Sequence, residues 1–204
     1  MHMEDFHSEI YPDPEITVPG ERPGGLQRFL IDVVETVLLS LLLFLGINAV
    51  SARIRIESVS MQPTLYEGDF VIVNKLAYKL GDFSRGDVIV FHYPPDPDRE
   101  PYIKRVIGLP GDRVSVQEGK VYVNNEPLRE PYISAPPVYQ GVWLVPEGSL
   151  FVLGDNRNSS SDSHSWGMVP YENVIGKAEV VYWPPEEWKL LNQETAVAAE
   201  SVQP

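Results

Sequence analysis

The sequence predicts a mainly β protein whose antiparallel sheets wrap into a barrel-like body, with one transmembrane helix in front of it. Three observations carry this prediction. After residue 52, short runs rich in β-branched and aromatic residues are separated by turns and Pro-rich loops, as is typical of strands. Little sequence with helical periodicity lies between these runs, which argues against a parallel α/β sheet. One long apolar run precedes them.

The N-terminal region divides into a polar tail and an apolar segment. Residues 1–25 combine acidic residues with prolines and glycines and offer too little apolar surface to order themselves, so we expect a disordered tail. Residues 26–50 are mostly apolar, and residues 36–50 carry no charge. Because about 20 such residues are needed to cross a bilayer as a helix, we predict a transmembrane helix at 26–50.

Two alternatives for the apolar segment stay open. Asp32 and Glu35 in its first turns are also compatible with an amphipathic helix or a buried helix of a soluble protein. Ala49-Val50-Ser51 places small residues after the apolar run, as at the cleavage site of a secretory signal, although the preceding region is long and acidic. Arginines on both sides of the segment leave its orientation unspecified by charge.

A β-rich body is expected over residues 51–188, followed by a flexible C-terminal tail at 189–204. Within the body, Glu118-Gly119 and Asn124-Asn125 have the composition of hairpin turns. The expected strands cover residues 53–56, 70–73, 88–91, 102–107, 114–116, 121–123, 149–153 and 174–183.

Composition excludes several classes of function. The formal net charge of −13 and the absence of a basic cluster argue against a nucleic-acid partner. The chain has no cysteine, which excludes disulfides, a thiolate nucleophile and Cys-ligated zinc. With four histidines, two of them in the N-terminal tail, we expect neither a metal site nor a cofactor.

Ser60 and Lys104 suggest a serine nucleophile with a lysine base. A serine hydroxyl is a poor nucleophile until a neighbouring group takes its proton, and an amine does so once its pKa falls from about 10.4 toward neutrality. Lys104 lies inside an apolar run, residues 102–109, where burial disfavours the charged ammonium. Taken alone, each residue also fits an ordinary structural role, as a turn serine or a solvent-facing lysine.

Five motifs in order resemble those of bacterial type I signal peptidases, membrane-bound Ser-Lys proteases that remove secretory signal peptides. The motifs are Ser-Met-Gln-Pro-Thr-Leu at 60–65, Gly-Asp-Phe-Val-Ile-Val-Asn-Lys at 68–75, Arg-Gly-Asp-Val-Ile-Val-Phe at 85–91, Tyr-Ile-Lys-Arg-Val-Ile-Gly-Leu-Pro-Gly-Asp at 102–112 and Gly-Asp-Asn-Arg at 154–157. The resemblance implies that Ser60 is the nucleophile and Lys104 the general base. It also implies an N-terminus in the cytoplasm and a catalytic domain on the extracytoplasmic side.

The resemblance assigns supporting roles to three further residues. The Ser58 hydroxyl, with the Ser60 N–H, would stabilise the oxyanion; strand alternation puts both side chains on one face. Ser160 would hydrogen-bond the lysine amine, and Asp162 would belong to the network behind the site. The chain departs from the family pattern at Asn158, a frequent acidic position, and at His164, a frequent arginine position.

The resemblance further implies shallow apolar pockets that admit small side chains at the first and third residues before the cut. The expected partners are therefore signal peptides of secretory preproteins and the lipid bilayer. The residues expected to line these pockets are Ile54, Ile56, Met61, Leu65, Val71, Val90, Tyr102 and Ile103.

Three rival interpretations remain open at this point. His164 is a possible base in a Ser60-His164-Asp triad, in place of Lys104. A self-cleaving Ser-Lys protease of the repressor-processing type would share the β-rich body, although no DNA-binding helical module is visible. A catalytically silent, membrane-anchored β-domain that binds partners is the alternative outside the enzymes.

Overall fold

The computed structural model describes residues 24–191. Of the tails predicted at 1–25 and 189–204, residues 1–23 and 192–204 lie outside this range. The chain divides into two compact units, Met1–Phe44 and Leu45–Pro204.

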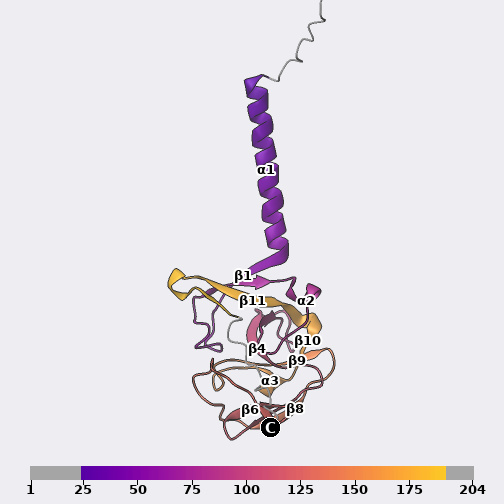
Figure 1. The fold of residues 1–204 in the computed structure, drawn as a ribbon, viewed down its shortest axis with the longest axis vertical. Coiled ribbons are helices and arrows are strands. Elements are labelled where there is room, and N and C mark those ends of the chain that lie inside the picture. Colours follow the sequence, from indigo (N-terminus) through magenta and orange to yellow (C-terminus); the bar gives the residue numbers. More distant parts are fainter. Residues whose placement is uncertain (1–23, 192–204) are drawn as a thin grey trace, which may run out of the picture. The chain divides into compact units, whose positions relative to one another are not determined.

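Helix α1 runs from Gly25 to Val50 without interruption (Figure 1). None of its residues is buried, and by length and composition it is able to cross a membrane. Ser51 directly after it already pairs with Asn74 as the first residue of strand β1. The Ala49-Val50-Ser51 tripeptide thus lies in regular helix and strand backbone rather than in an open loop.

The second unit is built mainly from two antiparallel sheets, which confirms the predicted fold class (Figure 1). The larger sheet has the order β1-β2-β11-β3-β4-β9-β10, with β12 paired to β11. Its strands are β1 Ser51–Arg55, β2 Phe70–Asn74, β3 Val88–Phe91, β4 Tyr102–Gly108, β9 Ser149–Leu153, β10 Val169–Pro170, β11 Val174–Trp183 and β12 Lys189–Leu190.

The smaller sheet has the order β7-β6-β5-β8. Both predicted hairpin turns occur there, and Glu118, Asn124 and Asn125 adopt positive φ values, which short turns between strands require. Its strands are β5 Arg113–Gln117, β6 Lys120–Val123, β7 Glu126–Pro127 and β8 Gly141–Leu144. The short helices of the body are α2 Ala77–Leu80, α3 Ser163–Trp166, η1 Tyr171–Asn173 and η2 Pro185–Glu187.

Strand β4 is central to the packing of the body. Its side chains from Ile103 to Ile107 are all buried, and they contribute to three separate apolar clusters: Ile103 to one, Val106 to another and Ile107 to the third. A side chain on this strand is therefore largely removed from water, and Lys104 is 3% exposed.

The C-terminal boundary of the body differs from the prediction. Strand β12 pairs with β11, and Leu191 is only 3% exposed in the first apolar cluster, so residues 189–191 belong to the body and not to a tail. Strand β12 could not be predicted from the sequence, because a two-residue strand is too short to show a periodic pattern. Its partner, the long strand β11, supplies the pairing.

Candidate active site

Ser60 and Lys104 come from separate segments and meet inside the body. The Nζ atom of Lys104 lies 2.7 Å from the Oγ atom of Ser60. Ser60 sits in the turn after β1, where the buried side chains of Met61 and Leu65 anchor the backbone. Lys104 lies on β4 opposite Ile89 of β3. The side chains predicted to form the catalytic pair are thus in direct contact.

The surroundings of Lys104 suit a base. Lys104 is 3% exposed, and burial lowers its pKa to about 8, although the carboxylates of Asp162 and Asp155 act in the opposite direction. The amine also donates to the Ile103 carbonyl oxygen at 2.8 Å. This second contact fixes the direction of the amine. A lysine with this pKa is partly uncharged near neutral pH and able to accept a proton.

Ser58 lies where an oxyanion donor is useful. Its Oγ atom is 3.2 Å from the Oγ of Ser60. The backbone carbonyl of Ser60 accepts a hydrogen bond from the Asn156 N–H at 3.0 Å, and the Asn156 side chain donates to the Val59 carbonyl. The loop that carries Gly-Asp-Asn-Arg therefore holds the turn at Ser60 through one backbone and one side-chain donor of Asn156.

Ser160 does not make the predicted hydrogen bond to the lysine amine. Its Oγ atom is buried and has no hydrogen-bond partner among residues 24–191. It lies against Gly154 instead, so closely that a Cβ at position 154 would collide with it and with the Ser60 carbonyl oxygen. The amine of Lys104 is directed by Ile103 and Ser60, which corrects the role expected for Ser160.

The Asp162 carboxylate contacts His164, which stands where the family pattern has an arginine. The buried Asp162 carboxylate accepts from the Gly154 N–H at 3.0 Å and contacts His164 Nδ1 at 2.5 Å. The His164 ring also stacks on Tyr139. Because Lys104 occupies the position next to Ser60, the structure gives no support to the histidine-base alternative.

A cavity of about 600 Å³ opens beside the catalytic pair. Four of the predicted pocket residues line it, namely Ile54, Ile56, Tyr102 and Ile103. The other lining residues are Arg53, Arg55, Glu57, Ser58, Val59, Ser60, Glu100, Pro101, Lys104, Ser159 and Ser161.

The other four predicted pocket residues are not part of the cavity lining, which corrects their assignment. Met61, Leu65, Val71 and Val90 are at most 1% exposed and belong to the first apolar cluster, together with Ile56 and Ile103. They support the lining side chains from behind. From the sequence, an apolar residue near a motif fits the cavity lining and the apolar core equally well. Only the packing of the folded chain decides between the two.

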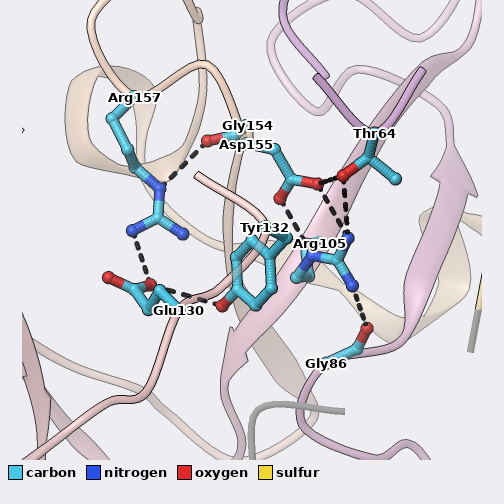
Figure 2. Close-up of polar contacts among 8 residues, drawn as sticks. All are labelled: Thr64, Gly86, Arg105, Glu130, Tyr132, Gly154, Asp155 and Arg157. Atoms are coloured by element: carbon cyan, nitrogen blue, oxygen red, sulfur yellow. Dashed lines mark hydrogen bonds and ion pairs between the residues drawn. The ribbon is translucent and has the colours of Figure 1, made fainter. Parts of the chain in front are cut away.

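Sequence reasoning assigned no role to a buried ion pair next to the site. Arg105 Nε and Nη2 donate to the two carboxylate oxygens of Asp155 at 2.8 and 2.7 Å (Figure 2). Thr64 donates to the same carboxylate at 2.5 Å, and Arg105 also donates to the Gly86 carbonyl. Arg105 and Asp155 both lie inside motifs named above, but they are 50 residues apart in the chain. The sequence therefore shows the two residues and does not show that they form a pair. Within residues 24–191, no cluster of potential metal ligands occurs.

Comparisons with known proteins identify the family of this chain. The family model described as signal peptidase, peptidase S26, matches residues 30–183. A signal peptidase I from Leptolyngbya laminosa is 49% identical over 163 residues, which cover 76% of this chain and 80% of that protein. A probable signal peptidase I-2 from Synechocystis sp. is 42% identical over 181 residues, with coverage of 85% and 83%.

A crystal structure of a signal peptidase I from Enterococcus faecalis is 31% identical and covers 48% of this chain and 97% of that one, with a TM-score of 0.44. The match to the family model spans most of the chain, and the relatives are matched over most of their own length. These matches confirm the resemblance drawn from the five motifs: the chain belongs to the signal peptidase family, peptidase S26.

Proposed function

We propose that this chain is a membrane-anchored serine endopeptidase that removes N-terminal signal peptides from exported preproteins, with Ser60 as nucleophile and Lys104 as general base. The observation that carries this assignment is the 2.7 Å contact between Lys104 Nζ and Ser60 Oγ at a buried position. Family membership and relatives named signal peptidase I support it. Nothing in the comparisons supports a silent binding domain.

The proposed reaction follows from this contact. Neutral Lys104 takes the proton of the Ser60 hydroxyl as its oxygen attacks the scissile carbonyl carbon. The C–N bond then breaks, the protonated lysine gives its proton to the leaving amine, and an acyl-enzyme remains. Lys104 next activates a water molecule that releases the acyl group. The Ser60 N–H and the Ser58 hydroxyl stabilise the oxyanion, each contributing roughly 3 kcal/mol.

The cavity beside Ser60 is the proposed peptide-binding site. Ile54 and Ile56 on one side, with Tyr102 and Ile103 on the other, present apolar surface to the residues that precede the cut. We expect small side chains at the first and third of these residues, because larger ones clash with the pocket walls. Such apolar pockets discriminate by roughly 1 to 3 kcal/mol for each methylene.

Helix α1 is the proposed anchor, with the N-terminus in the cytoplasm and the catalytic body on the extracytoplasmic side of the membrane. Proposed domains are a tail before α1, the anchor, and a body from residue 51 to residue 191. A signal peptide carries its own apolar segment, so anchoring enzyme and substrate in one bilayer raises their effective concentration.

Cleavage of a preprotein by the full chain in detergent tests this function. The substrate carries Ala at both specificity positions, and Ser60→Ala and Lys104→Ala are each expected to lower the cleavage rate by on the order of a thousandfold or more. Ser84→Ala and Lys79→Ala, at exposed positions, are the matched controls and retain activity. Activity that survives Lys104→Ala refutes the proposed base, and a folded parent protein without activity favours the binding domain.

A further inference from the structure

A second buried ion pair, outside the catalytic pair, joins the two sheets of the body. Arg157 follows Gly-Asp-Asn in the chain, and its side chain is fully buried. Its Nη1 donates to the Glu130 carboxylate at 2.6 Å, and its Nε donates to the Gly154 carbonyl at 3.0 Å (Figure 2). Glu130 lies in the connection between β7 and β8 of the smaller sheet, and its side chain is 6% exposed.

Tyr132 links this ion pair to the first one. Its hydroxyl donates to the same Glu130 oxygen at 3.3 Å, and its ring lies under the Arg105 guanidinium at 4.0 Å (Figure 2). Arg105 in turn holds Asp155 in a two-pronged contact. The connection between β7 and β8 thus supplies one carboxylate and one ring to two buried arginines. Such a network is costly to break, because an unpaired charge would remain inside the protein.

The network ends at the backbone of the nucleophile. Gly154, whose carbonyl oxygen Arg157 holds, lies against the Ser60 carbonyl so closely that no side chain fits between them. Asn156, between Gly154 and Arg157 in the chain, donates its N–H to that same Ser60 carbonyl at 3.0 Å. A displacement of Arg157 therefore displaces Gly154 and Asn156, which both contact the Ser60 carbonyl, whereas Lys104 is fixed separately on β4.

We propose that Glu130 is a positioning residue for the reaction: through Arg157 it holds the loop at residues 154–157 against Ser60 and so keeps the Ser60 hydroxyl in reach of Lys104. Glu130 is not among the residues that line the cavity, and its carboxylate accepts hydrogen bonds from Arg157 and Tyr132. Its effect falls on the rate of the chemical step and not on peptide binding. A misplacement of about 1 Å between reacting groups lowers a rate by about a hundredfold.

The experiment measures kcat and KM of full-length Glu130→Gln in detergent, on the preprotein used above, with thermal unfolding followed in parallel. Glutamine keeps the shape of Glu130 but removes the charge that compensates Arg157. The expected result is a kcat at least tenfold lower with a KM within about twofold of the parent, measured well below the unfolding midpoint.

Asp112→Asn is the matched control, because it breaks another ion pair of the body, with Arg85, away from the catalytic pair. It is expected to lower the unfolding midpoint and to keep the parental kcat. Parental kcat in Glu130→Gln overturns the inference. An equal loss of kcat in Asp112→Asn also overturns it, since the effect is then general destabilisation.

Tyr132→Phe is the second test should Glu130→Gln fail to fold. It keeps the ring under Arg105 and removes only the hydroxyl that donates to Glu130. A kcat several-fold lower at constant KM is expected, and an unchanged kcat refutes the inference.

The inference rests on the proposed role of Ser60, and Ser60→Ala distinguishes a failure of the positioning role from a failure of the proposed function. If Ser60→Ala is inactive while Glu130→Gln and Tyr132→Phe are parental, only the positioning role is wrong.

Discussion

At the scale of single residues, the chemistry depends on the burial of one amine. Lys104 is 3% exposed, and its Nζ atom has two hydrogen-bond partners, Ser60 Oγ and the Ile103 carbonyl. Burial disfavours the ammonium form, and the more distant carboxylates of Asp155 and Asp162 restore part of its stability. The balance leaves the pKa of Lys104 at about 8.

The pH dependence of cleavage follows from this value. Lys104 must be uncharged to accept a proton, so kcat/KM is expected to rise with pH and to reach half of its plateau near pH 8, since kcat/KM reports the free enzyme. Initial rates at substrate concentrations well below KM, between pH 6 and 10, measure the profile. A profile that is flat across this range contradicts lysine as the base.

The stability of the fold has a related pH dependence with a defined sign. The folded pKa of about 8 lies below the ordinary value of 10.5, so between these two values the unfolded chain binds more protons than the folded one. The Lys104 contribution to the free energy of unfolding therefore increases as pH rises through this window. Comparison of the parent with Lys104→Met isolates this contribution.

At the scale of elements, most strands could be predicted because each carries its own alternation or β-branched run. The two-residue strands β7, β10 and β12 could not, since so short a segment forms only in response to a neighbouring strand. Strand β8 was also missed, at the end of a Pro-rich loop. These four strands were found only from their pairing partners.

Strand β12 gives a prediction at this scale. Leu191 directly after it is 3% exposed, whereas Leu190 is 53% exposed. Leu191→Ala is expected to lower the free energy of unfolding by about 2 to 3 kcal/mol, because it leaves a cavity in the core. Leu190→Ala is expected to change it by less than about 0.5 kcal/mol. Chemical denaturation measures both, and equal small effects would place residues 189–191 outside the body.

At the scale of the whole molecule, an apolar helix and a β-rich body follow one another in the chain. The proposed orientation places the body on the extracytoplasmic side, where exported preproteins emerge. Because the chain lacks cysteine, single cysteines introduced on either side of α1 are specific labelling sites.

A membrane-impermeant maleimide tests this orientation in intact spheroplasts that express the full chain. Leu80→Cys, at an exposed position of the body, is expected to react without lysis. His2→Cys, in front of α1, is expected to react only after lysis. The reverse pattern contradicts the proposed orientation, and full protection of both positions does so as well.

By itself, the sequence determined the β-rich class and the apolar helix, because local periodicity is a property of short segments, and it predicted the pair Ser60 and Lys104 through the resemblance of its motifs. Tertiary structure decided that Met61 and Val71 pack in the core instead of lining the cavity. It also decided that Ser160 faces Gly154. A sequence pattern indicates that a side chain is buried. Which residues from distant segments pack against it depends on how the sheets come together.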